Sequence, residues 1–335
     1  MKKIINDPEL FEKEMLEGIC AAYGDKVGLL DGNDKVLVSK YPVKDGKVGI
    51  ATLGGSGHLP VFLGYVGQGL LDACAVGNVF ASPSASTMAD AIRYADHGSG
   101  VLCLYGNYGG DKLNTAMACE EVDFDDIETA EVIVADDICS SPEETKNERR
   151  GVAGMVYAFK VAGAAAENGE DLETVAAVAK KALENIRTMG VALTPCIVPR
   201  AGEPSFSIAD DEIEIGMGIH GEPGIEVRKM MTADEIAETL FTTINKELQL
   251  SEGDECSVMI NGLGGTPLEE QFIVYRKVAQ LVEACGAKIV MPHIGEFATS
   301  MEMAGMSLTV FKLDDELKAL LEQPAQSPFY TNINK

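Results

Sequence analysis

The sequence predicts an α/β protein built from two layered α/β domains with mixed or parallel sheets. Short apolar runs rich in β-branched residues alternate with longer helical patterns, which is typical of sheets covered by helices. The apolar runs are nearly continuous, as in strands that are buried on both faces. The length of 335 residues exceeds one ordinary domain and suggests about two.

The first half supplies strands and helices in alternation. We expect buried strands at residues 48–53, 100–104 and 131–135, and helices at 84–96 and 112–121. A helical stretch then covers 151–190, including 152–168 and 172–189, before Pro195, Pro199 and Pro204 break the pattern. We therefore predict an N-terminal α/β domain at 1–190 and a C-terminal α/β domain at 191–335.

The second half repeats this alternation. Residues 212–215 alternate with period two, as in a half-buried strand. Thr232 and Glu235 form a capping box that opens a helix to about residue 248. Further elements are expected as strands at 257–260 and 288–291 and a helix at 268–284. The tail, 323–335, contains two prolines and is expected to be irregular, and whether it packs back on the protein stays open.

Composition excludes some classes of function. The net charge is −26, from 53 acidic and 27 basic side chains, which argues against binding nucleic acid or an anionic membrane. The eight cysteines are dispersed without C-x-x-C spacing, so neither a disulfide framework nor a zinc site is predicted. Reduced thiols in a cytoplasmic protein are expected, with no secretory signal or membrane span.

Four glycine-rich loops follow predicted strands. They lie at residues 54–58, 106–111, 216–224 and 262–267. Ligands of open α/β sheets bind beyond the carboxyl ends of strands, and glycine lets backbone amides approach a ligand closely. One such loop could be only a tight turn, but four of them favour a binding site.

The loops lack the signatures of a nucleotide site. No phosphate-binding loop with G-K-[ST] occurs. Gly216-x-Gly218-x-x-Gly221 matches a dinucleotide fingerprint, but Glu222-Pro223-Gly224 follows and cannot open the required helix. No protein-kinase motif set is present. We expect no cofactor on this chain.

Two of the four histidines, His58 and His220, lie in glycine loops, where we expect flanking glycines to leave the imidazoles exposed to a ligand. Imidazole suits proton transfer near neutral pH, and Asp111 could orient an imidazole or accept a hydroxyl proton. His97 is expected to be structural, and His293 could line the same cleft. A metal site of His58, His220 and Asp111 has no supporting spacing, so none is predicted.

The loops resemble the dihydroxyacetone kinase family, and within it the substrate-binding K subunit. The resemblance rests on Gly-Gly-Ser-Gly-His at 54–58, Asn-Tyr-Gly-Gly-Asp at 107–111, Arg-Arg-Gly-Val-Ala-Gly at 149–154 and Gly-Ile-His-Gly-Glu-Pro-Gly at 218–224. Residues 262–267 and 303–308 also look familial, so the resemblance covers nearly the whole chain.

The resemblance implies a role for each site residue. His220 would form a covalent hemiaminal with the ketone carbonyl of a short-chain ketose such as dihydroxyacetone. His58 and Asp111 would act on the accepting hydroxyl, and Gly55, Ser56 and Gly57 would hold substrate oxygens. The family also implies a homodimer, and a separate L subunit that carries ATP or ADP with magnesium. A phosphotransferase-system protein could recharge that ADP.

Three positions depart from the family pattern. Leu59 stands where the family has Glu, Leu53 where a Gly is common, and Gly106 where a substrate-contacting Lys is usual. Loss of the lysine removes three donors and a positive charge and is expected to open space. Two alternatives therefore stay open: a kinase subunit for a larger ketose such as erythrulose, or a non-catalytic paralogue that senses the ketose as a coactivator.

Overall fold

The computed structural model describes residues 2–333, so residues 1, 334 and 335 of the predicted domains lie outside the described residues. The chain forms two compact units, and each is made of separate segments. The first unit contains 1–134, 155–181 and 319–335, and the second contains 135–154 and 182–318. In place of one boundary near residue 190, the chain therefore crosses between the units at four points.

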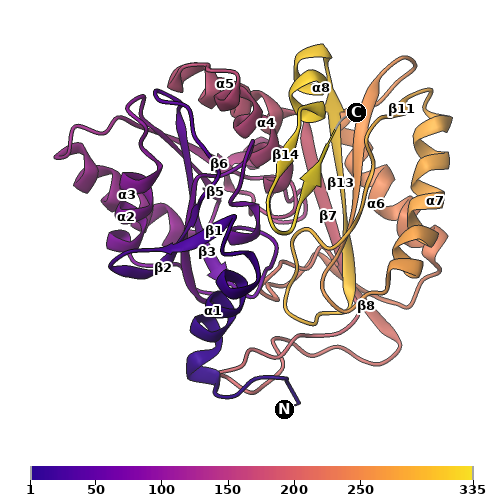
Figure 1. Cartoon of the computed structure of the whole chain (residues 1–335). Coiled ribbons are helices and arrows are strands. Elements are labelled where there is room, and N and C mark those ends of the chain that lie inside the picture. Colours follow the sequence, from indigo (N-terminus) through magenta and orange to yellow (C-terminus); the bar gives the residue numbers. More distant parts are fainter. Residues whose placement is uncertain (1, 334–335) are drawn as a thin grey trace. The chain divides into compact units, whose positions relative to one another are not determined.

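A six-stranded mixed sheet forms the centre of the first unit (Figure 1). Its strands, in sheet order, are β1 (Val27–Leu30), β2 (Asn33–Ser39), β4 (Ala73–Val79), β3 (Gly49–Ser56), β5 (Val101–Gly106) and β6 (Thr129–Val134). The predicted strands at 48–53, 100–104 and 131–135 are confirmed as β3, β5 and β6. Because β3 and β5 are parallel neighbours, their carboxyl ends meet at one edge of the sheet.

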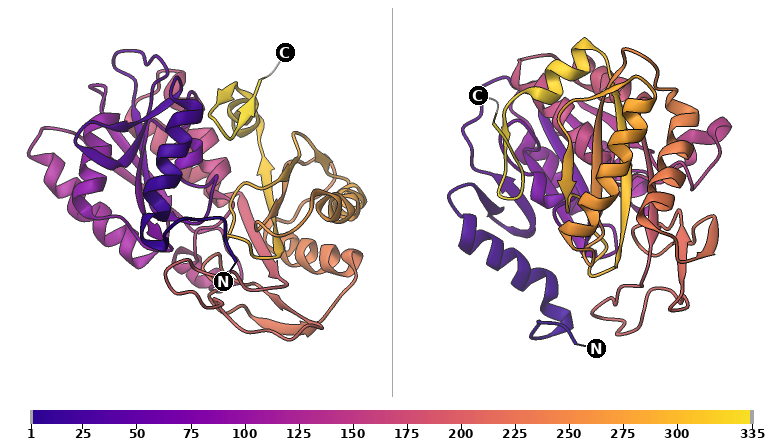
Figure 2. Two further views of the ribbon diagram at one scale, coloured as in Figure 1. Left: turned by 60° about the horizontal axis from the view of Figure 1, so that its bottom comes forward. Right: turned by 90° about the vertical axis from the view of Figure 1, so that its right-hand side faces the viewer.

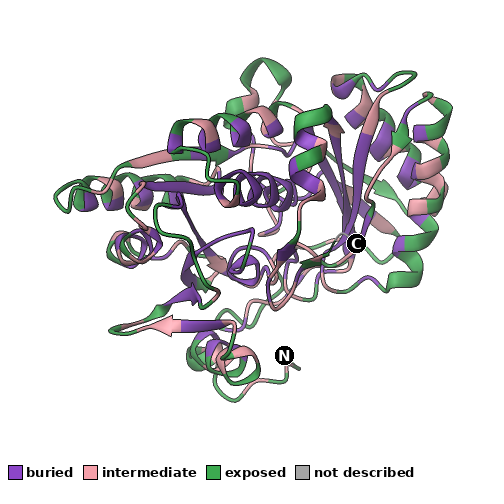
Figure 3. Ribbon diagram, turned by 45° about the horizontal axis from the view of Figure 1, so that its top comes forward, coloured by how far each residue is buried: buried purple, intermediate pink, exposed green. Residues whose placement is uncertain are grey.

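Helices cover this sheet. They are α1 (Phe11–Tyr23), α2 (Ala85–Ala95), α3 (Gly109–Asp123), α4 (Met155–Glu167) and α5 (Leu172–Glu184). Side chains of α2 and α3 share a buried cluster with Ala51, Leu53 and Cys103 of the sheet. The α4 helix is buried along almost its whole length (Figure 3). Its apolar residues continue all around the helix, as expected for a helix enclosed by protein.

The C-terminal segment packs back onto the first unit. It contains part of α8 (Asp315–Glu322) and the short strands β14 (Ala325–Gln326) and β15 (Thr331–Asn332). The backbone N–H of Gln326 donates to the Gln68 carbonyl at 2.9 Å, and Ser327 Oγ donates to the Gly64 carbonyl at 2.6 Å. The described part of the tail is thus more regular than the prolines indicated.

The second unit is built on a seven-stranded sheet. Its main path is β11 (Lys288–Ile289), β10 (Glu255–Gly262), β13 (Gly305–Leu313), β7 (Ile186–Ala192), β8 (Glu212–Ile215) and β9 (Glu226–Lys229), and β12 (His293–Gly295) pairs with β10. Cross-strand pairing places Gly262, Met306, Val191 and Ile215 in one row. The glycine loops after β8 and β10 therefore leave the sheet at the same level.

Two of the predicted helices cover this sheet as neighbours (Figure 2). The α6 helix (Ala233–Leu248) begins with the predicted capping box, in which Thr232 and Glu235 bond each other's backbone N–H groups. The α7 helix (Leu268–Ala284) has the predicted bounds. Their apolar faces share a core with Val258 and Val310 of the sheet.

The predicted helix at 172–189 is wrong beyond residue 184. There α5 ends and β7 begins, and β7 runs between β13 and β8. All seven residues of β7 are buried, so it has no period-two alternation. Arg187 and Thr188 are held inside by Glu247 and Thr309, and these polar residues obscured the apolar run that marks a central strand.

The remaining regular elements are short 3-10 helices, η1 (Pro8–Leu10), η2 (Leu63–Tyr65) and η3 (Glu143–Glu148). Within residues 2–333, none of the helices has both the length and the apolar character needed to cross a membrane.

Candidate functional site

The first glycine loop closes β3 in a tightly packed environment. A Cβ at Gly55 would lie 2.8 Å from the backbone nitrogen of Ala81, so glycine is required by close approach of the neighbouring chain. Ser56 Oγ donates to the Gly77 carbonyl at 2.8 Å, and Gly57 has a positive φ of 98°. These contacts fix the backbone that leads to His58.

His58 is fully buried. Its ring stacks on Phe80 with centroids 4.8 Å apart and meets Phe62 edge-on at 6.2 Å. The expectation that flanking glycines leave this imidazole exposed is therefore wrong, because two aromatic rings enclose it. Such packing holds the ring in one orientation, which suits an imidazole that exchanges a proton with one particular atom of a substrate.

Asp111 lies at the same edge of the six-stranded sheet, beyond β5. It occupies the first turn of α3 and is 5% exposed. The amino end of a helix carries partial positive charge, which favours a carboxylate there. The parallel neighbours β3 and β5 thus bring Gly55, Ser56, Gly57, His58, Gly106 and Asp111 to one side of the first unit.

The space next to the Gly106 backbone, where a Cβ atom would lie, is not open. A Cβ there would lie 3.2 Å from Met155 Sδ and 3.3 Å from the Tyr108 ring. Our expectation of open space is wrong at this atom, because Met155 and Tyr108 occupy the room next to the backbone. The lost donors and the lost positive charge remain consequences of glycine at this position.

The second histidine loop, residues 216–224, belongs to the second unit and follows β8. Gly216 N donates to the Gly190 carbonyl at 2.7 Å, and Ser300 Oγ donates to the Ile219 carbonyl at 2.5 Å. Gly221 has a φ of 85°, and its N–H donates to the Gly218 carbonyl at 3.0 Å. The next regular element is β9, which confirms that the glycine pattern here is no dinucleotide fingerprint.

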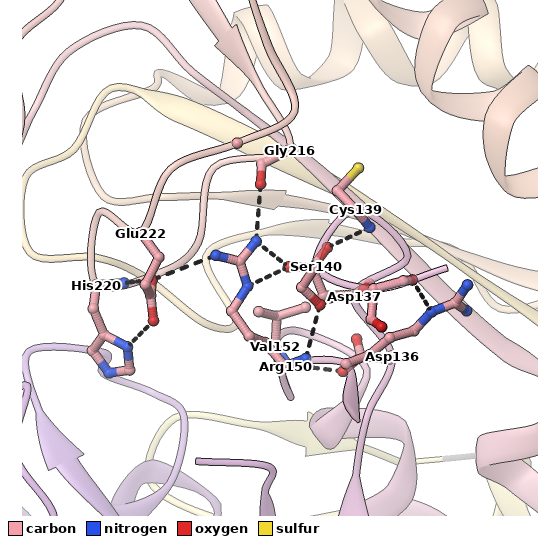
Figure 4. Close-up of polar contacts among 12 residues, drawn as sticks. Asp136, Asp137, Cys139, Ser140, Arg150, Val152, Gly216, His220 and Glu222 are labelled. Carbon is pink, nitrogen blue, oxygen red and sulfur yellow. Dashed lines mark hydrogen bonds and ion pairs between the residues drawn. The ribbon is translucent and has the colours of Figure 1, made fainter. Parts of the chain in front are cut away.

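His220 is held by a carboxylate of its own loop. Its Nδ1 lies 2.8 Å from Glu222 Oε1, and its backbone N–H donates to Glu222 Oε2 at 2.9 Å (Figure 4). Burial opposes ionisation of Glu222, but the hydrogen bond and charge of His220 lower the pKa of that carboxyl to about 2. An ionised carboxylate only accepts, so we assign the proton to Nδ1 and the lone pair to Nε2.

Glu222 in turn lies beside Arg150, which reaches the loop from residues 135–154 (Figure 4). Arg150 also bonds Asp137 and the Gly216 carbonyl. The sequence analysis missed both Glu222 and Arg150 as site residues. An acidic residue two positions after a loop histidine was a local signal for Glu222, whereas the approach of Arg150 depends on the tertiary fold.

The other two histidines have different surroundings. His97 Nε2 lies 3.5 Å from Asp72, which also binds Lys47, and a structural role for His97 stays a prediction. His293 lies in β12 and meets Phe297 edge-on at 5.6 Å. Across the described residues, no group of three or more His, Cys, Asp or Glu side chains is arranged to hold a metal ion.

Comparisons with known proteins agree with these motifs. Residues 17–329 match the family model described as the Dak1 domain. The chain is 43% identical over 330 residues to the dihydroxyacetone-binding subunit DhaK of PTS-dependent dihydroxyacetone kinase 2 from Listeria innocua serovar 6a, covering 98% of this chain and 99% of that one. It is also 43% identical to an L-erythrulose kinase of Pectobacterium atrosepticum, covering 98% of this chain and 56% of that enzyme.

A solved structure gives a third comparison. The dihydroxyacetone kinase operon co-activator Dha-DhaQ has a TM-score of 0.86 to this chain and 31% identity, covering 93% of this chain and 96% of that one. Proteins described as kinases and as a co-activator are thus both similar to this chain.

Proposed function

The chain belongs to the Dak1-domain family, and from that premise we propose that it is the ketose-binding subunit of a dihydroxyacetone-type kinase. It holds a short-chain ketose covalently on His220. A separate L subunit then supplies the phosphoryl group to a terminal hydroxyl of the bound ketose.

The observation that carries this proposal is the pairing of His220 with Glu222. In the tautomer with a proton on Nδ1, the Nε2 lone pair adds to the ketone carbon as the C=O π bond breaks. The electron pair moves to the carbonyl oxygen, which takes a proton from solvent. The Nδ1 proton lies on a 2.8 Å hydrogen bond to Glu222, which accepts it and passes it to solvent, so the proton that the carbonyl oxygen took is returned and the charges balance.

This chemistry selects for a carbonyl. Glycerol has hydroxyls but no carbonyl, and so it cannot form the hemiaminal. In the first unit, we propose that Asp111 and His58 exchange a proton with the accepting hydroxyl. Amides of Gly55, Ser56 and Gly57 bind substrate oxygens, and Gly106 lines the same side.

The nucleotide belongs to the partner in this proposal. ATP, or ADP recharged by a DhaM-like phosphotransferase protein, is bound with magnesium by the DhaL-like L subunit. The Listeria innocua relative is described as PTS-dependent, which supports ADP recharged by a phosphotransferase protein as the source of the phosphoryl group. We also propose a homodimer and a cytoplasmic location, where the eight free thiols stay reduced.

Two alternatives have specific support. The similarity to an L-erythrulose kinase favours a four-carbon ketose as substrate. The similarity to the Dha-DhaQ co-activator, together with Gly106 and Leu59, favours a ketose sensor without turnover.

A reconstituted assay separates these functions. The chain is mixed with an L subunit, a phosphoryl donor and a panel of triose and tetrose ketoses. The kinase proposal predicts a phosphorylated product that Asp111→Asn and His220→Ala abolish. Ketose binding without turnover by any L subunit would reject the kinase in favour of the sensor. The ratio of kcat/KM values between ketoses identifies the preferred chain length.

A further inference from the structure

The adjacent residues Arg149 and Arg150 bond different parts of the second unit. Arg149 donates to both carboxylate oxygens of Glu247 at 2.7 and 2.8 Å, and Glu247 also binds Arg187. That cluster joins α6 to β7 and the arginine segment. Arg150 instead turns to the loop that carries His220 (Figure 4), so the two neighbours serve different parts of the second unit.

Arg150 donates hydrogen bonds to two groups and lies close to the carboxylate of a third. Its Nε donates to Asp137 Oδ2 at 2.9 Å, and its Nη2 donates to the Gly216 carbonyl at 3.0 Å. Its Nη1 lies 4.0 Å from Glu222 Oε2. The planar guanidinium carries five donors in fixed directions, so one side chain can bond Asp137 and Gly216 and still present its charge to Glu222, whereas lysine cannot.

We propose that Arg150 is a positioning residue for His220, acting through the Glu222 carboxylate. This inference rests on the proposed function, in which His220 is the nucleophile. Glu222 Oε2 is placed between the His220 backbone N–H and the Arg150 cation, and Oε1 then points at His220 Nδ1. Holding one carboxylate oxygen fixes the direction of the other, and that direction sets the tautomer and the orientation of the ring.

Gly218 leaves the space in which Arg150 and Glu222 approach each other. A Cβ at Gly218 would lie 2.5 Å from Arg150 Nη1 and would also collide with Glu222 Oε2. Any larger residue would push the cation and the carboxylate apart, although the backbone there is not in the left-handed region. Glycine at this position is thus explained by the space that the Arg150–Glu222 contact needs.

The segment that carries Arg150 is itself anchored. Asp136 accepts from the backbone N–H groups of Val152 at 2.8 Å and Gly154 at 2.7 Å. Asp137 is nearly fully buried, and its Oδ2 accepts from Arg150 Nε at 2.9 Å and lies 2.8 Å from Nη2. Arg150 therefore connects an anchored segment of the second unit to the Glu222 carboxylate.

The test reads the His220 ring directly in the full chain without any ketose. Protein labelled with ¹⁵N-histidine contains four imidazoles, and the His220 signals are assigned with His220→Gln. The parent is expected to show a protonated Nδ1 and an unprotonated Nε2. In Arg150→Gln, the proton is expected to redistribute between the two nitrogens, and carbonyl-adduct formation with labelled dihydroxyacetone is expected to fall roughly tenfold.

Two further variants separate positioning from folding. Arg150→Lys keeps the positive charge but loses the several fixed donors of the guanidinium. It is therefore expected to move the His220 signals in the same direction as Arg150→Gln, and it can replace that variant if Arg150→Gln does not fold. Arg149→Lys is expected to lower stability and leave the His220 tautomer unchanged. If both Arg150 variants keep the parent's His220 signals, the inference is wrong. If the parent forms no adduct with any ketose, the proposed function fails, but the tautomer comparison still decides the role of Arg150.

Discussion

Replacing Glu222 by glutamine tests how the nucleophile is prepared. A hydrogen bond to a charged group contributes about 1.5–3 kcal/mol. Because the Glu222 side chain is 32% exposed, we expect the lower end, about 1.5 kcal/mol, which corresponds to roughly tenfold in an equilibrium constant. Glutamine can offer either an oxygen or an NH₂ group to His220 Nδ1, so it no longer fixes the tautomer. We predict a roughly tenfold weaker ketose adduct.

The assay titrates the protein with dihydroxyacetone that carries ¹³C at the carbonyl and measures the fraction of label that becomes tetrahedral. Glu226→Gln is the matched control, because it removes the same charge from an exposed carboxylate that pairs with Arg228 on β9. The control should form the adduct as the parent does. An adduct in Glu222→Gln as stable as that of the parent would refute the assignment of Nε2 as the prepared nucleophile.

Three further predictions follow from the same structure. Arg149→Ala should lower the free energy of unfolding by about 3 kcal/mol in urea titrations, because it leaves the partly buried Glu247 without one of its two arginines. A loss under about 1 kcal/mol would mean that the Arg149–Glu247 ion pair contributes no more than a surface ion pair. Gly106→Lys should lower the free energy of unfolding by about 1–3 kcal/mol through crowding against Tyr108 and Met155, which a lower melting temperature would report, and an unchanged melting temperature would show that these side chains move aside freely. Because the pKa of Glu222 is lowered, its ionised carboxylate stabilises the folded protein fully above pH 4.5, and this stabilisation is lost as the pH falls from 4.5 toward about 2. A plot of melting temperature against pH should therefore be flatter for Glu222→Gln than for the parent in that window, and parallel plots would contradict the prediction.

Local signals predicted much of the fold. The α7 helix matches its predicted bounds because an amphipathic pattern fills it from end to end, and α6 begins at the capping box that the sequence shows. The glycine loops were found because tight backbone approach leaves glycine at positions such as Gly55. Such features depend on residues that are close together in the chain.

Features that depend on distant residues were not predicted. The strand β7 carries Arg187 inside the second unit, which is possible only because Glu247 of α6 meets it there. Likewise, the sequence marked His220 but not Arg150, since their link runs through a contact between segments about seventy residues apart. The enclosure of His58 by Phe62 and Phe80 also required the folded chain.

Covalent binding of a ketose to His220 can be observed directly in one NMR measurement. Protein labelled with ¹⁵N-histidine is mixed with dihydroxyacetone labelled with ¹³C at the carbonyl. We expect a tetrahedral carbon signal that couples to one ring nitrogen of His220, that is lost in His220→Ala and that is kept in His97→Gln. A tetrahedral signal that persists in His220→Ala, or the absence of any coupling to the imidazole in the parent, would contradict it.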